Sequence, residues 1–197
     1  MGLNLNEAYG QTSLEEEEKE GLIIRSIATK EELDEFEQQN IEEAIQWTIG
    51  KPMKAETILT EKFVKTLHKK MFGDVWRWAG EFRKTEKNLE INKWEIPPAL
   101  KVLCDDTLFW ISNDSFSSDE IAMRFKHRIV SIHCFPNGNG RHSRLMADLI
   151  IEKVFQRPLF SWGTREAISE NARSVYLNAV KLADKNDYCR LIEFARS

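Results

Sequence analysis

The chain has 197 residues and a formal net charge of −4, with 42% hydrophobic and 30% charged side chains. This balance is typical of one soluble globular domain, and the negative charge argues against general nucleic-acid binding. No apolar run reaches the ~18 residues that favour a membrane span, and the N-terminus lacks a secretory signal. We therefore expect a cytoplasmic protein that binds neither membrane nor nucleic acid.

The first 28 residues are predicted to form an acidic arm. Residues 14–21 read L-E-E-E-E-K-E-G, a biased run that is typical of a solvated, partly helical segment. The chain changes character at Thr29, which forms a capping box with Glu32 and is followed by apolar residues at helical spacing. We therefore divide the chain into an arm at 1–28 and a main domain at 29–197.

The rest of the main domain also reads mostly as helices. Thr60 is an expected N-cap, and Pro97 and Pro98 stand where a helix N-terminus tolerates proline. Ser118 is expected to cap a helix whose apolar face continues to Ile132.

Further along, an apolar helical face runs over 145–154, and a last pair of helices is expected at about 165–183 and from about 188 to the end. Between the helices, weak alternation over 82–94 predicts a short β-hairpin.

The stretch from His133 to Arg144 reads H-C-F-P-N-G-N-G-R-H-S-R. Gly138, Asn139 and Gly140 can adopt positive φ at little steric cost, so that successive N–H groups point into one concavity. The helix expected to begin near Arg141 adds unsatisfied N–H groups and the positive end of its dipole. These features predict a phosphate site.

Two arginines reinforce that interpretation. Arg141 and Arg144 are three residues apart, share a helix face and lie in a first turn, where stability alone favours Asp or Glu. Because one guanidinium group can donate hydrogen bonds to two oxygens of a phosphate, we interpret both arginines as ligands of a polyphosphate.

His133 closes the preceding helix, where a helix C-terminus would raise its pKa. Beside an anion site it could take a proton from an incoming hydroxyl; the alternative is a capping or core histidine. Asn137 either offers an amide oxygen to a Mg²⁺ that bridges phosphates or only forms the turn. His142 is expected to face solvent or to pack on its helix.

The stretch resembles the Fic-domain signature, H-x-F-x-[D/E/N]-G-N-G-R-x-x-R. Residues 67–83 also resemble the segment that leads into the Fic flap, and 176–194 resemble the closing helices of that family. The resemblance covers the chain from about residue 29 onward, and its pattern is similar to the Fic subgroup called mobile mystery protein B. The signature positions that match are His133, Phe135, Gly138, Asn139, Gly140, Arg141 and Arg144.

The resemblance implies an all-α, Fic-like helical bundle with one short β-hairpin flap and an N-terminal acidic arm or inhibitory helix. It also implies binding of ATP and Mg²⁺ and transfer of AMP to a Ser, Thr or Tyr hydroxyl of a target protein. His133 would be the general base, and Asn137 would stand at the metal position, where a neutral ligand is weaker than the usual carboxylate. The other implied roles are phosphate cradle for Gly138, Asn139 and Gly140, phosphate binding for Arg141 and Arg144, and target binding at the flap for Arg83, Lys84 and Thr85.

The family also has an inhibitory pattern, [S/T]-x-x-x-E-[G/N], whose glutamate pairs with the second signature arginine. Glu20 and Gly21 match its last two positions, while Glu16 replaces the Ser or Thr. Our hypothesis is that Glu20 contacts Arg144 and inhibits the enzyme; the alternative is a mobile acidic arm. An antitoxin-like partner is implied by the resemblance alone.

Two alternatives to AMP transfer stay open. The fold could transfer another phosphate-linked group, or it could be a non-catalytic module that binds a nucleotide or a protein. The intact His133 argues against a non-catalytic module.

Overall fold

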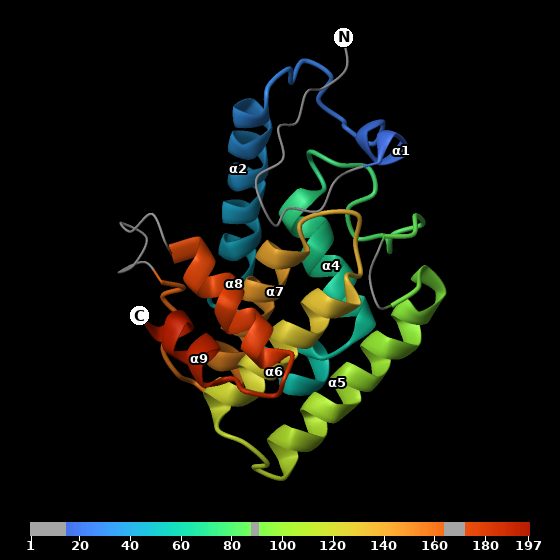
Figure 1. Ribbon diagram of the computed structural model, residues 1–197. Coiled ribbons are helices and arrows are strands. Elements are labelled where there is room, and N and C mark those ends of the chain that lie inside the picture. The colour runs from blue at the N-terminus through green and yellow to red at the C-terminus, as the bar shows by residue number, and fades with distance from the viewer. Residues whose placement is uncertain (1–14, 88–90, 164–171) are drawn as a thin grey trace.

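The computed structural model describes residues 15–87, 91–163 and 172–197, and the regular structure in these ranges is helical (Figure 1). The all-α fold predicted from the sequence is therefore confirmed. No helix in the described ranges combines the length and the apolar character that crossing a bilayer needs. The elements are α1 (Glu16–Lys19), α2 (Lys30–Thr48), α3 (Ala55–Ile58), α4 (Glu61–Phe72), the 3₁₀ turn η1 (Lys93–Glu95), α5 (Ile96–Ser112), α6 (Ser118–Ile132), α7 (Asn139–Leu149), the π-helical turn η2 (Ile150–Val154), α8 (Ala172–Ala183) and α9 (Cys189–Arg196).

Side-chain caps fix where the helices begin. The hydroxyl of Thr29 accepts the N–H of Glu32, and the Glu32 carboxylate accepts the N–H of Thr29, each at 3.2 Å. The predicted capping box of α2 is therefore confirmed. Thr60 caps α4 as expected. The cap of α6 is Ser117, one residue before the predicted Ser118.

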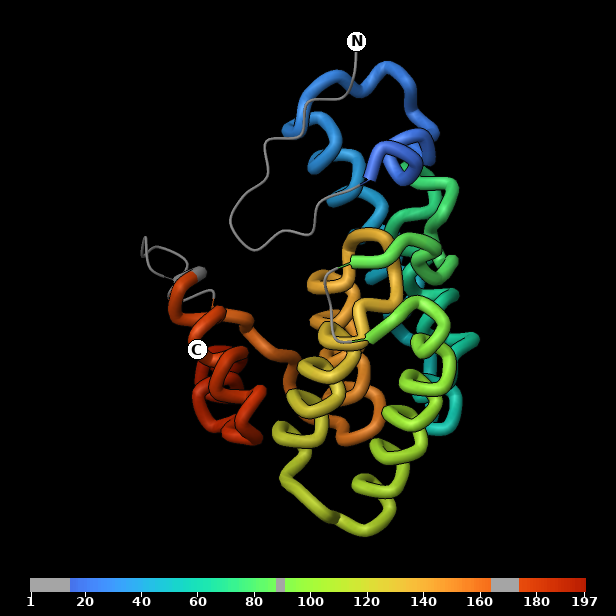
Figure 2. The backbone as a smooth tube through the Cα atoms, turned by 45° about the vertical axis from the view of Figure 1, so that its right-hand side comes forward, coloured from blue at the N-terminus to red at the C-terminus, as the bar shows by residue number. Residues whose placement is uncertain are grey.

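Helices α6 and α7 form the centre of the fold, with α5 on one side of them and the α8–α9 pair on the other (Figure 2). Helix α4 packs against both α2 and α7, so the N-terminal half of the chain is built around the same centre. The loop that joins α6 to α7 is therefore held between several helices. Core side chains around it with less than 2% exposure include Leu67, Met71, Phe72, Phe125, Phe135 and Met146.

The predicted β-hairpin is not confirmed. Residues 82–87 and 91–92 contain no strand, and residues 88–90 lie outside the described ranges. The backbone N–H of Arg83 donates instead to the carbonyl of Cys134 at 2.9 Å, so this segment pairs with the α6–α7 loop. In the described part of the chain, the isolated β-bridge joins Leu22 to Trp76.

The closing helices agree with the prediction where they are described. Helix α8 ends at Ala183 as predicted, while the predicted helical residues 165–171 lie outside the described part of the chain. Helix α9 begins at Cys189, one residue after the expected start.

Candidate active site

His133 lies at the C-terminal end of α6 in the left-handed conformation, with φ 53° and ψ 59°. Its N–H still donates to the carbonyl of Ile129 at 3.2 Å, so the residue ends the helix and turns the chain into the loop. Positive φ is uncommon for a residue with a Cβ, and backbone strain of this kind clusters at functional sites. The side chain is buried, since the residue is only 9% exposed.

The surroundings of His133 keep its ring neutral. Burial, followed by the charges of Arg83 and Lys87, lowers its pKa to about 4. The expectation that the helix C-terminus raises this pKa is therefore wrong, because desolvation and two nearby cations outweigh the helix dipole. At neutral pH the imidazole carries one nitrogen lone pair and can accept a proton.

The two glycines of the turn beyond His133 differ in backbone conformation, whereas the sequence suggested that both could adopt positive φ. Gly138 has φ +76°, and a Cβ at this position would lie 2.5 Å from Cζ of Phe72. Gly140 has no positive φ, because it already belongs to α7. A Cβ built on Gly140 meets nothing within 4 Å, so the space above this first turn is open. The two glycines thus serve different needs: one permits the turn, and the other leaves room at the helix N-terminus.

Asn139 holds the loop together from inside. Its amide oxygen accepts the N–H of Phe135 at 3.0 Å, and its amide nitrogen donates to the carbonyl of Phe135 at 2.7 Å. The side chain is therefore fully engaged within the loop. Its backbone N–H, and that of Gly140, belong to the first turn of α7, where helix N–H groups lack intrahelical partners.

The two signature arginines leave α7 with different partners. Arg141 forms an ion pair with Glu37 of α2 at 2.6 Å and lies over the ring of Phe72. Arg144 lies over the rings of Tyr176 and Trp162, at 5.1 and 5.9 Å from their centres.

Arg144 forms no ion pair with a carboxylate within the described ranges, where its Nε is buried without a hydrogen-bond partner. Burial raises the pKa of Tyr176, but Lys126 and Arg144 together outweigh it and lower that pKa below its usual value. Positive charge is therefore concentrated around Arg144.

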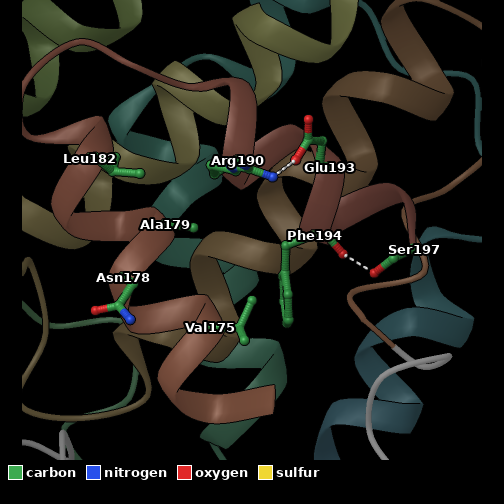
Figure 3. A pocket seen from close by; sticks show the side chains of 8 residues that line it. All are labelled: Val175, Asn178, Ala179, Leu182, Arg190, Glu193, Phe194 and Ser197. Carbon is green, nitrogen blue, oxygen red and sulfur yellow. Dashed lines mark hydrogen bonds and ion pairs between the residues drawn. The ribbon is translucent and has the colours of Figure 1, made fainter. Parts of the chain in front are cut away.

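Tyr176 and Asn178 both lie on α8, but they serve different surfaces. Tyr176 reaches inward to Lys126, whose ammonium donates to its hydroxyl. Asn178 lines an outer groove of about 410 Å³ between α8 and α9, with Val175 and Leu182 from the same helix (Figure 3). Of the two, only Tyr176 belongs to the surroundings of the second signature arginine.

Two buried histidines support the loop. The sequence pattern did not assign either of them to the site. His68 of α4 accepts the N–H of Gly80 at Nδ1 (3.0 Å), so its Nε2 carries the proton and donates to the carbonyl of Asn137 (3.0 Å). Its ring stacks on Phe135, with the ring centres 3.7 Å apart. His142, which was expected to face solvent or to pack on its helix, is 1% exposed and reaches Val64. Both histidines lie on amphipathic helices. Helical spacing can predict that such a side chain is buried, but it cannot predict which distant residue it contacts.

Among the three predicted flap residues, Arg83 points inward. It is 2% exposed, and its guanidinium donates to the carbonyls of His133 (Nε, 2.8 Å), Thr85 and Ile91. Its role in the structure is thus to fix the flap segment against the loop. Lys84 is exposed and pairs with Glu81 at 3.0 Å.

The N-terminal arm reaches the site through Glu18 of α1. The Glu18 carboxylate is buried and accepts from the hydroxyl of Thr85 at 2.6 Å and from the ammonium of Lys87 at 2.7 Å. Glu20 is exposed, and no ion pair joins it to Arg144 within the described ranges. In the described ranges, the residue predicted to inhibit thus forms no ion pair with the arginine, while the acid two positions earlier contacts the flap segment.

Asn137 offers little to a metal by itself. Its side-chain oxygen accepts the N–H of Gly138 at 2.5 Å, and its backbone carbonyl accepts from His68. The described residues contain no cluster of three or more His, Cys, Asp or Glu that could hold a metal ion. The donor set does not fit a cation held by the protein alone.

Comparison with known proteins agrees with this geometry. Residues 58–151, which include the loop, match the model of the Fic/DOC family. The fold is similar to that of Fic-1 (residues 134–508) from C. elegans, with a TM-score of 0.68, 19% identity and coverage of 90% of this chain and 51% of the other. It is also similar to BepC from Bartonella tribocorum with bound AMPPNP, with a TM-score of 0.64, 15% identity and coverage of 92% and 97%.

Curated sequences lead to the same family. The chain is 27% identical over 140 residues to the protein adenylyltransferase Fic of Drosophila grimshawi and 28% identical over 140 residues to that of Drosophila willistoni. These matches cover 69% of this chain but only 28% and 27% of the relatives, so it matches about a quarter of their length. Residues 58–151 thus match a Fic/DOC family domain, and the chain has the fold of the Fic structures.

Proposed function

We propose that the protein is an adenylyltransferase that transfers AMP from ATP to a Ser, Thr or Tyr hydroxyl of a target protein. The observation that carries the proposal is a neutral, buried His133 at one end of a loop whose other end is the open first turn of α7. This arrangement supports the proposal that His133 acts as a base beside an anion site. The relatives named protein adenylyltransferase support the same reaction.

The phosphates of ATP would bind where α7 begins. Unpaired N–H groups and the helix dipole favour anions there, and the open space above Gly140 admits them. Arg141 and Arg144 would hold the β- and γ-phosphates, because Arg141 lies in this first turn and Arg144 lies in the next turn of α7. Their charge would stabilise the pyrophosphate that leaves, which is preorganised electrostatic catalysis.

The chemical step requires one proton transfer. The target hydroxyl oxygen attacks the α-phosphorus and forms a new P–O bond, while the bond between the α-phosphorus and pyrophosphate breaks. The hydroxyl proton passes to the ring nitrogen of His133 that carries the lone pair. Magnesium is proposed to enter with ATP as part of the substrate, beside Asn137.

We also propose that the N-terminal arm restrains this reaction. Glu18 ties α1 to Thr85 and Lys87 of the flap segment, where the target is expected to bind. The indole N–H of Trp78 donates to the Glu18 carbonyl at 2.9 Å and fixes the same turn. The restraint would act at the target side of the site, since Glu18 does not contact the arginines. An antitoxin-like partner stays a prediction of the family resemblance.

Labelled ATP tests the proposed reaction. Label from the α-phosphate should appear on protein, label from the γ-phosphate should not, and mass spectrometry should find added AMP. His133→Ala should abolish labelling while ATP binding, measured by calorimetry, persists. Transfer of the γ-label alone would replace the proposal with phosphate transfer, and ATP binding without any label would favour a binding module.

A further inference from the structure

We propose that Glu37 of α2 is a positioning residue that orients Arg141 for the phosphates beyond the α-phosphate of ATP. The inference rests on the proposed function, because it assigns a means of control to the same phosphate site. Glu37 is remote from the signature in sequence and lies outside the matched residues 58–151. Within the described ranges, its contact with the site is the ion pair to Arg141.

The Glu37 carboxylate is itself fixed on both oxygens. The residue is 3% exposed; Oε1 accepts the indole N–H of Trp76 at 2.6 Å, and Oε2 pairs with Nη1 of Arg141 at 2.6 Å. Trp76 is 1% exposed and stacks on Trp78. A carboxylate held this way has little rotational freedom, so it can define the position of the guanidinium.

The helix that carries Glu37 is also anchored close to it. One turn further along α2, Asn40 exchanges two hydrogen bonds with Asp74: its amide nitrogen donates to the carboxylate at 3.1 Å, and its oxygen accepts the Asp74 N–H at 3.0 Å. Residues three apart share a helix face, so Glu37 and Asn40 face the same segment. Helix α2 is therefore registered against the segment that precedes the flap.

Arg141 needs such a partner. It lies in the first turn of α7, where the helix dipole disfavours a cation, and its side chain is 38% exposed. Phe72 supports the guanidinium from one face, with the ring centre 4.9 Å away. Glu37 occupies Nη1, and a guanidinium has five N–H donors, so others stay available for phosphate oxygens.

A purely stabilising role explains the arrangement less well. A buried ion pair often contributes little net stability, because desolvation offsets the attraction. Glu37 instead extends from α2 to a partly exposed arginine at the proposed phosphate site. This contact would hold the Arg141 guanidinium in position before ATP binds. Because Arg141 is assigned to the outer phosphates, loss of Glu37 should affect ATP and leave AMP unaffected.

The test is the affinity of Glu37→Gln for ATP and for AMP, measured by calorimetry on the full chain. ATP binding should weaken by about tenfold or more, the range expected when a charge-assisted hydrogen bond no longer holds its donor in place. AMP binding should change by less than about twofold, and Glu37→Asp, which keeps the charge, should recover part of the loss. Glu35→Gln is the matched control, because Glu35 is exposed on the same helix.

Each other outcome has a definite meaning. Equal weakening of ATP and AMP, or unchanged ATP binding, would overturn the positioning role. Tighter ATP binding or faster transfer in Glu37→Gln would show that the carboxylate competes with phosphate. If Glu37→Gln unfolds, Trp76→Phe retains the Glu37 carboxylate, keeps an aromatic ring at this position and removes the indole N–H that fixes Oε1; it should weaken ATP binding selectively, to a smaller extent. A wild-type chain with equal affinity for ATP and AMP would instead refute the proposed phosphate site.

Discussion

Replacing each glycine of the 138–140 turn by alanine should have opposite effects on stability. At Gly138 the new Cβ requires a left-handed backbone, which costs roughly 1–2 kcal/mol. It would also lie 2.5 and 2.6 Å from two ring carbons of Phe72, an overlap that costs about 1–3 kcal/mol to relieve. Gly138→Ala should therefore lose about 2–5 kcal/mol of the free energy of unfolding.

Gly140→Ala supplies the matched control. The same methyl group is added to a helical residue, where nothing lies within 4 Å of it. Alanine is favoured over glycine inside helices by up to about 1 kcal/mol, so stability should be unchanged or slightly higher. ATP binding should nevertheless weaken, because the methyl group enters the space assigned to the phosphates.

Urea unfolding with linear extrapolation measures both changes, provided that the slope with denaturant stays constant. Measured against Phe72→Leu alone, the double variant Phe72→Leu/Gly138→Ala should show only the backbone cost, because the overlapping ring is gone from both. The requirement for glycine at position 138 is refuted if Gly138→Ala loses less than about 1 kcal/mol of the free energy of unfolding. It is also refuted if Gly140→Ala is the more destabilised variant. Undiminished ATP binding by a stable Gly140→Ala would contradict the phosphate assignment alone.

Lowering the pH should destabilise the fold through two buried histidines, at a pH above that at which most carboxylates take up protons. Burial is the main cause that lowers the pKa of His133 and His142 to about 4, so the unfolded chain binds their protons near pH 6.5 while the folded chain does not. The free energy of unfolding should fall as pH is lowered between these values, by up to roughly 3 kcal/mol for each ring. Asp148 opposes this in part, because burial raises its pKa to about 6; urea midpoints equal at pH 7 and pH 5 would contradict the prediction. In the N-terminal arm, Glu18→Gln should accelerate AMP incorporation, whereas Glu20→Gln, a change at an exposed position, should leave the rate unaltered. Acceleration by Glu20→Gln alone would restore the hypothesis drawn from the sequence.

Local signals predicted most of the helices correctly. Thr29 with Glu32 and Thr60 specify helix starts through bonds to residues three positions away, and such bonds can be read from spacing. The loop was found because its glycines and cations are adjacent in the chain. Helix α2 begins at Lys30, directly after its N-cap Thr29.

Long-range partners could not be predicted in the same way. The pairing of Arg141 with Glu37, and of Glu18 with Lys87, joins residues far apart in sequence, and no local pattern encodes either contact. Glu20 fits a motif but is exposed, whereas the buried acid of α1 is Glu18, two residues earlier. The alternation over 82–94 suggested strands, whereas Arg83 directs that segment to the α6–α7 loop.

The imidazole of His68 links the signature loop to the segment that precedes the flap residues. One nitrogen receives the N–H of Gly80, next to the flap segment, and the other donates to Asn137 in the signature loop. A second proton on the ring would set two donors against each other at Gly80, so the link exists only in one tautomer of the neutral ring. Burial, the largest cause, lowers the pKa of His68 well below its ordinary value and keeps the ring neutral, while the two hydrogen bonds fix its tautomer. The spacing between Gly80 and the signature loop is thereby set by the width of one imidazole ring.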